Sequence, residues 1–213
     1  MTLALLAVLA LAPTVCIDPG HPSENGSGAK GKTLTEVSVA WDVATRVRDL
    51  LQAEGVRVVM TKGSRDEKVT NKRRAEIANE AKADLMLRLH CDAASSHGFS
   101  VYYPAQTGKV GGVTGPAKSV LASSERAAKT FHAVFAAALK GILSDRGLHT
   151  DAATSIGGKQ GALSGSIHSK VPVLLVEMFV LTNAQDEAYA ATKEGLDTMA
   201  AALVRATLAV VRL

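Results

Sequence analysis

Aromatic and sulfur-bearing residues are scarce in this chain of 213 residues. Aromatic side chains make up 4% of it, against 47% for apolar residues as a whole, so a core must be built mainly from Ala, Val and Leu. Two cysteines, Cys16 and Cys91, are too few for a disulfide framework. Each lies in or beside an apolar, strand-like run, which favours two buried thiols, with a disulfide only if their strands lie close together.

Long basic and long apolar tracts are also missing. The net charge of +4 is spread along the chain without a run of five or more Lys and Arg, which argues against a nucleic-acid partner. A mildly positive protein is still attracted to anionic polymers such as cell wall. The apolar run at residues 3–12 is too short to cross a bilayer, so no membrane span is predicted.

The N-terminal residues 1–13 allow two interpretations. Ala10, Leu11 and Ala12 resemble the small-residue cleavage site of a secretory signal, which makes the segment a candidate signal peptide. The positively charged start of such a signal is missing and Pro13 would follow the cut, which favours an apolar N-terminal element instead. Residues 14–213 show no linker and no repeat, and the length fits one domain.

Strand-like and helix-like segments alternate through most of the chain. Strands are predicted at 14–18, 56–60, 84–90, 99–103 and 171–177, and helices at 36–54, 70–81 and 123–143. Residues 22–33, 108–115 and 144–169 are rich in Gly, Ser or Asp and are predicted as loops. Asn183 is predicted to cap a last helical region that Gly195 divides. The alternation predicts a single α/β domain, with a largely parallel twisted sheet and helices on both faces.

Candidate functional residues lie where these strands end. His21 follows the first strand, His90 ends the third and Glu177 ends the last. Sites in open α/β sheets form at the carboxyl ends of parallel strands, so these side chains are expected at one edge, with Glu36 at the start of the first helix. Two His and one carboxylate are a common catalytic zinc set, and a further carboxylate can transfer protons.

Ordinary structural roles compete with this interpretation. A single His at a strand end usually forms hydrogen bonds at the surface or in the core. Glu36 follows Thr33 at the spacing of a capping box, in which it would bind backbone N–H groups instead of a metal. A carboxylate such as Glu177 in an apolar strand needs a partner, which a metal site would supply. The remaining histidines are not assigned to the metal, although His168 is a candidate substrate contact.

Four segments in order resemble the type 3 family of zinc-dependent N-acetylmuramoyl-L-alanine amidases. They are Cys16-Ile17-Asp18-Pro19-Gly20-His21, then Glu36 opening a helix, then Arg74-Ala75-Glu76-Ile77-Ala78-Asn79 with Ala83-Asp84-Leu85 and Leu89-His90-Cys91-Asp92-Ala93, then Val176-Glu177-Met178-Phe179-Val180-Leu181-Thr182-Asn183. Each segment is weak evidence by itself, but four with suitable spacing over residues 14–210 are specific.

The resemblance implies an enzyme acting on peptidoglycan. His21, Glu36 and His90 would bind one Zn²⁺, and Glu177 would be the general acid and base. The substrate would be the amide between N-acetylmuramic acid and L-alanine of the stem peptide. We also predict substrate contacts at Arg74, Asp92 and His168. A periplasmic or extracellular location, a monomeric state and an activator protein are further expectations.

Some positions depart from the family pattern. Pro22 and Ser23 follow His21 where the family usually has two glycines, and Asp92 stands where Asn is common. Met178-Phe179 replaces an apolar residue plus Gly, and residues 145–169 do not follow the expected pattern. Two alternative functions remain. One is a non-catalytic wall-binding relative. The other is another zinc hydrolase such as a peptidase or deacetylase, because zinc sites of this kind serve many acyl substrates.

Overall fold

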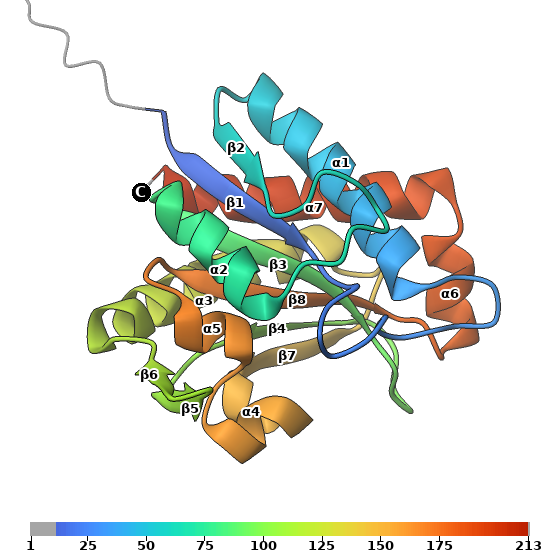
Figure 1. Cartoon of the computed structure of the whole chain (residues 1–213). Coiled ribbons are helices and arrows are strands. Elements are labelled where there is room, and N and C mark those ends of the chain that lie inside the picture. Colours follow the sequence, from blue (N-terminus) through green and yellow to red (C-terminus); the bar gives the residue numbers. More distant parts are fainter. Residues whose placement is uncertain (1–11, 213) are drawn as a thin grey trace, which may run out of the picture.

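A six-stranded sheet crosses the centre of the computed structural model, which describes residues 12–212 (Figure 1). Its strands are β1 (Thr14–Pro19), β2 (Arg57–Met60), β3 (Leu85–Asp92), β4 (Phe99–Tyr103), β7 (Asp145–Thr150) and β8 (Val173–Val180), in the order β2-β1-β3-β8-β4-β7. The predicted signal peptide or apolar element at 1–13 lies outside the described residues, except for its last two positions.

The sheet is mostly parallel. β2, β1, β3 and β8 run in one direction, β4 pairs with β8 in the antiparallel sense, and β7 runs parallel to β4. The C-terminal strand β8 therefore lies inside the sheet, between two strands that precede it in the chain. This arrangement confirms the predicted α/β class with a largely parallel sheet.

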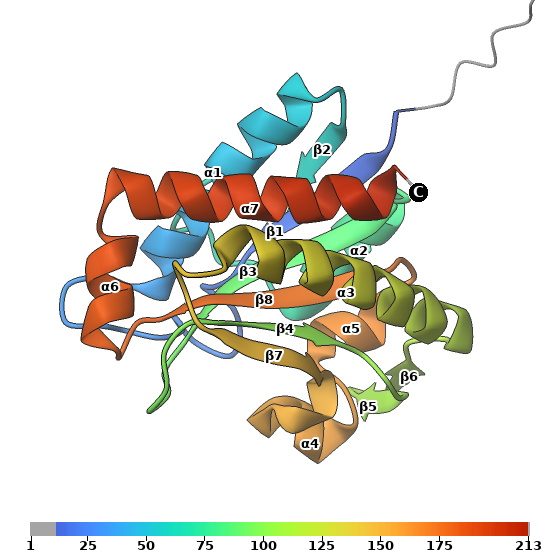
Figure 2. The same ribbon diagram turned by 180° about the vertical axis from the view of Figure 1, so that it is seen from behind.

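Helices cover both faces of the sheet, and a short hairpin lies beside it. The long helices α1 (Glu36–Ala53), α3 (Lys118–Leu139) and α7 (Lys193–Val211) pack on one face (Figure 2). The other face carries α2 (Asn71–Glu80) and α5 (Ser164–His168), and the remaining elements are β5 (Gly108–Val110), β6 (Val113–Gly115), α4 (Ser155–Gln160) and α6 (Ala184–Ala190). In the part of the chain that the structure describes, no helix combines the length and apolar character of a membrane span.

Side chains on alternate positions of the strands divide between two unequal interiors. Ile17, Leu87 and Leu89 enter the main core under α1, α3 and α7. Their neighbours Asp18 and Arg88 point to the opposite face, beside α2, where the apolar cluster is small. The α2 face of the sheet is therefore polar at its centre, which is where the candidate site lies.

The two thiols belong to these different interiors. Cys16 packs in the small cluster on the α2 side, whereas Cys91 packs in the main core. Both are buried and free. Because they lie on opposite faces of the sheet, the prediction of two buried thiols is confirmed and a disulfide between them is excluded.

Several predicted boundaries are wrong. The loop at 108–115 is the β5–β6 hairpin, and α3 begins at Lys118, ahead of the predicted start. Residues 144–169 are not irregular, because they contain the edge strand β7 and the helices α4 and α5. Asn183 caps α6 as predicted, accepting from the backbone N–H groups of Gln185 and Asp186. The last helical region is divided as predicted, but between α6 and α7 and not at Gly195. Gly195 lies in the first turn of α7, where its N–H donates to the capping Thr192.

Candidate metal centre

The first donor, His21, follows β1, at a point where the chain passes close to β3. Gly20 donates its N–H to the carbonyl of Leu89 at 2.8 Å, which brings the loop over β3. A Cβ atom at Gly20 would lie 2.6 Å from the ring of His90, so the residue before His21 must be glycine. The glycine of the Asp-Pro-Gly-His motif thus brings His21 and His90 together, with ring centroids 5.3 Å apart.

The second donor, Glu36, is the first residue of α1 and does not cap that helix. The capping box is formed by Thr35 and Ser38, each bonding the other's backbone N–H at 3.3 Å. The alternative capping box from Thr33 to Glu36 is therefore wrong. The carboxylate of Glu36 instead turns toward β3, where its Oε1 lies 2.8 Å from Nδ1 of His90.

The donor atoms of His21, Glu36 and His90 all lie within 4.8 Å of one another. His21 Nδ1 lies 2.9 Å from the carbonyl of Gly26, and donation to that carbonyl leaves Nε2 free to bind, 3.6 Å from Glu36 Oε1. His90 Nε2 is buried and has no hydrogen-bond partner within residues 12–212. Two imidazoles and one carboxylate with an unpartnered buried nitrogen fit a divalent metal ion such as zinc.

The electrostatics of this set favour metal binding. Burial opposes ionisation of Glu36, but the hydrogen bond and charge of His90, with His21 and the Ala29 N–H, outweigh it and lower the Glu36 pKa. Burial also lowers the pKa of His90, which favours its neutral form. A metal ion binds an ionised carboxylate and neutral imidazoles, so both groups are already in the required state.

Glu177 lies directly beside these donors. In the sheet it is opposite His90 of β3 on one side and opposite Ser100 of β4 on the other. β3 continues to Asp92 and β8 to Val180, so the predictions that His90 and Glu177 end their strands are wrong. The two residues are nevertheless paired in the sheet, beside the other donors. The Oε2 of Glu177 is buried without a partner among the described residues. Burial, followed by the charges of Glu36 and Asp92, raises the pKa of Glu177 well above its ordinary value.

A cavity of about 280 Å³ opens over the set. Its lining comes from the loop after β1, from α2, from the α4–α5 region and from the sheet: His21, Ser23, Asn25, Asn71, Arg74, Arg88, His90, Thr154, Ser155, Ile156, Leu163, Ser164, Leu175 and Glu177. The segment 145–169, which departs from the family pattern, thus supplies one wall. That wall is polar except for Leu163 and the partly exposed Ile156.

The predicted substrate contacts occupy three different places. Arg74 is buried and donates to Asp18 and to the carbonyls of Pro19, Pro22 and Val69, contacts that explain it without a substrate. Asp92 accepts from Arg146 at 2.9 Å, near Glu177. His168 lines a separate cavity bounded by α2, α3 and α5, so the structure does not bring it to the metal set. α5 connects the two cavities, with Ser164 at its start lining the site cavity and His168 at its end lining the separate one.

Asp18 is the main supporting residue that sequence reasoning did not explain. Its buried carboxylate accepts from Arg74 at 2.6 Å, Arg88 at 2.8 Å and Thr61 at 2.6 Å. Burial would raise the pKa of Asp18, but the two guanidinium groups outweigh it and hold that pKa well below the ordinary 3.8. The aspartate of the motif therefore anchors β1 to β3 and α2 beneath the metal set.

Replacing Asp18 should destabilise the fold. We expect Asp18→Asn to lower the free energy of unfolding by about 3–5 kcal/mol, because it leaves two buried guanidinium groups without a charge partner. Because the folded pKa is lowered, the carboxylate stabilises the fold above about pH 5 and the effect is lost as the pH falls. Urea unfolding of the wild type and the variant at several pH values measures the loss of stability and its pH dependence. Asp49→Asn, at an exposed carboxylate, is the control. An equal loss of stability in Asp49→Asn would contradict the anchoring role of Asp18.

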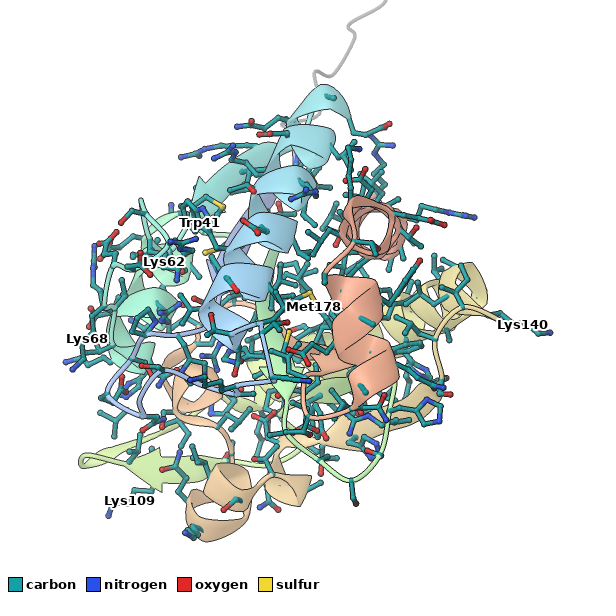
Figure 3. All side chains as sticks on the ribbon, turned by 90° about the vertical axis from the view of Figure 1, so that its right-hand side faces the viewer. Trp41, Lys62, Lys68, Lys109, Lys140 and Met178 are labelled. Carbon is teal, nitrogen blue, oxygen red and sulfur yellow. The ribbon has the colours of Figure 1, made fainter. Side chains whose placement is uncertain are left out.

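Lys62 and Gly28 are further supports with little signal in the sequence. Lys62 is buried beside Trp41 (Figure 3), and its ammonium donates to the carbonyls of His21 and Arg65. Burial lowers the pKa of Lys62 to about 8. Gly28 has a φ of +77°, and a Cβ there would lie 2.2 Å from Glu36 Oε2. Only the glycine in the polar loop could have been suspected from sequence.

A mostly parallel α/β sheet with a candidate metal centre beside a buried carboxyl group is typical of a metal-dependent hydrolase. Comparison with known proteins narrows this class. A family model described as N-acetylmuramoyl-L-alanine amidase matches residues 15–209. The chain therefore belongs to the type 3 N-acetylmuramoyl-L-alanine amidase family.

Individual relatives agree with this membership. LytC, an N-acetylmuramoyl-L-alanine amidase of Bacillus subtilis (strain 168), is 34% identical over 176 residues, which are 81% of this chain and 30% of LytC. The chain thus spans less than a third of that relative. Ami1, an N-acetylmuramyl-L-alanine amidase from Mycobacterium smegmatis, has the same fold, with a TM-score of 0.77, 24% identity and coverage of 94% of this chain and 97% of Ami1. The CwlD amidase from Clostridioides difficile, solved in complex with the GerS lipoprotein, gives a TM-score of 0.74 at 16% identity over 94% of this chain and 98% of CwlD.

Proposed function

We propose that this chain is a zinc-dependent amidase that hydrolyses the bond between the lactyl group of N-acetylmuramic acid and L-alanine of the peptidoglycan stem peptide. The observation that carries the proposal is the convergence of His21, Glu36 and His90 within 4.8 Å, beside Glu177, in a member of an amidase family. The relatives' names supply the substrate, and the geometry supplies the reaction type.

His21, Glu36 and His90 would hold the metal. When bound there, a zinc ion polarises the scissile carbonyl as a Lewis acid and promotes ionisation of water. The protein fixes its donors beforehand, because Gly26 orients the ring of His21, while Ala29 and Cys91 bind the carboxylate of Glu36 through their N–H groups. Donors held in this way need little reorganisation when the metal binds.

Glu177 would move the protons of the reaction. Its unpartnered Oε2 takes a proton from the water that adds to the lactyl carbonyl carbon. The same proton then passes to the nitrogen of L-alanine as the C–N bond breaks, so the products are a carboxylic acid and an amine. The environment that raises the pKa of Glu177 makes its carboxylate a stronger base than an ordinary glutamate.

Substrate, location and partners follow from this activity. Peptidoglycan as the substrate implies work in the periplasm or outside the cell. An activator protein remains a prediction, and the GerS complex of the structurally similar CwlD supports a search for one. The monomeric state and the absence of a nucleic-acid partner also stay predictions.

The presence of all four chemical groups favours catalysis over a non-catalytic wall-binding role. A binding relative would have no need for an unpartnered carboxyl oxygen of Glu177 next to the unpartnered Nε2 of His90, since such buried groups are costly. A zinc peptidase or deacetylase would use the same groups, and family membership argues against that alternative.

Digestion of purified peptidoglycan tests the proposal. The zinc-loaded protein should release stem peptides with a free N-terminal L-alanine, detected by mass spectrometry. Pretreatment with a chelator should abolish release, and added Zn²⁺ should restore it. Absence of release from the zinc-loaded protein would contradict the amidase function, and release of acetate instead would indicate a deacetylase.

A further inference from the structure

The first turn of α6 carries two adjacent buried carboxylates, Asp186 and Glu187, outside the candidate metal centre. Neither is in an ion pair in the part of the chain described here. Between them they bind backbone N–H groups of three other segments, of which the end of β8 is near in sequence and the other two are far away. These segments lead to the residues of the site.

Glu187 binds the loop that precedes α1. Its Oε1 accepts from the N–H of Thr33 at 2.6 Å, the N–H of Leu34 at 2.9 Å and the hydroxyl of Thr33 at 3.1 Å. These N–H groups also lower the pKa of Glu187 to about 2, so it is ionised at neutral pH. Figures 1 and 2 both show this loop running beside α6.

The bound loop is a narrow turn with Glu36 at its base. Gly31 and Leu34 close its tip through an N–H to carbonyl bond of 2.9 Å. At the base, the N–H of Ala29 donates to Glu36 Oε2 at 2.6 Å, and the N–H of Glu36 donates to the carbonyl of Ala29 at 2.9 Å. Holding the tip therefore restricts the residues that orient the Glu36 carboxylate.

Gly31 allows this close contact. A Cβ atom there would lie 2.5 Å from Glu187 Oε1 and 2.6 Å from the carbonyl oxygen of Leu181. The loop thus packs against both α6 and the end of β8. A side chain at Gly31 would push the loop away from Glu187.

Asp186 extends the same contact to the other parts of the site. Its Oδ2 accepts from the N–H of Gly98 at 2.6 Å and the N–H of Val180 at 2.9 Å. Gly98 lies in the loop that follows the His90 strand, and Val180 ends the Glu177 strand. The first turn of α6 therefore binds the loop before α1, the loop after β3 and the end of β8, each of which is connected to a residue of the site.

We infer that Glu187 is a positioning residue of the metal centre, which holds the 29–36 loop so that the Glu36 carboxylate faces His21 and His90. This inference rests on the proposed zinc role of Glu36. Glu187 acts through the loop and does not touch the donor atoms. Loss of the Glu187 carboxylate should weaken zinc binding more than it affects the rest of the fold, because α6 and the sheet keep their other contacts.

Zinc affinity of the full chain tests the inference, measured by competition with a chromophoric chelator. We expect Glu187→Ala to raise the zinc dissociation constant about 10-fold, the lower end of the effect of removing a residue that bonds a ligand directly, because Glu187 acts on Glu36 through the loop. Glu187→Gln should cause a smaller rise, because its amide oxygen still accepts a hydrogen bond but lacks the charge. Gly31→Ala, which displaces the loop from the other side, should act in the same direction. The exposed Glu194→Ala is the matched control and should bind zinc like the wild type.

The outcomes separate this inference from the proposed function. If the wild type binds zinc and a folded Glu187→Ala variant binds it with the same affinity, within about twofold, the positioning role is overturned. The amidase proposal is then left intact. If Glu187→Ala does not fold by circular dichroism, the comparison of Glu187→Gln with the wild type decides in the same way. A wild type that does not bind zinc overturns both.

Discussion

Glu177→Gln should lower the turnover number for peptidoglycan hydrolysis by about 10²- to 10⁴-fold, the usual contribution of a positioned general acid and base. Glutamine keeps the size of the side chain but cannot accept and pass on a proton. The zinc content should stay at the wild-type value, because Glu177 is not one of the three converging donors. Initial rates of stem-peptide release, with metal analysis of the same samples, measure both quantities.

The control for this experiment is Glu125→Gln on the surface of α3, where the carboxylate pairs with Lys129. Its rate should match that of the wild type. A Glu177→Gln protein that binds zinc and keeps the wild-type rate would exclude the acid and base role. Loss of zinc from this variant would instead assign Glu177 to the metal set.

His90→Ala should remove both zinc and activity. The ring contributes the unpartnered buried Nε2 and also bonds Glu36, so the variant loses one donor and the orientation of another. We expect zinc bound by the purified protein to fall from one ion per chain to a trace, and stem-peptide release to fall below detection. Metal analysis after dialysis and the digestion assay check the two results.

A second histidine provides the comparison. His132 on α3 bonds Asp145 at 3.0 Å, in a partly exposed pair outside the metal set. His132→Ala should retain full zinc and activity. Full zinc content in His90→Ala would remove His90 from the proposed ligands, whatever happened to the rate.

Much of the fold could be predicted because its strong periodic segments are also its buried ones. The run around Leu85, Leu87 and Leu89 and the apolar stripe of α1 follow directly from sequence. β7 could not, because its sequence holds Asp145, Gly147 and His149 and becomes a strand only by pairing with β4. An edge strand that is half exposed has no continuous apolar pattern to reveal it.

The residues of the candidate site could be predicted from the sequence, but the residues that hold them in place could not. The ordered motifs predict His21, Glu36, His90 and Glu177, and parallel pairing of β1, β3 and β8 brings the segments that bear them to one region. The network of Asp18 with Arg74 and Arg88 depends on side-chain directions that no local pattern encodes. The same limit explains His168, which is close to Glu177 in sequence but lines a different cavity at the end of α5.

The position of β8 within the sheet has a consequence for synthesis of the protein. β4 and β7 reach the rest of the sheet only through β8, and β8 also brings Glu177. A nascent chain, or a product truncated before residue 173, can neither close the sheet nor complete the reactive centre. Any hydrolysis that depends on Glu177 would therefore require synthesis of the chain through β8, and shorter products would lack it.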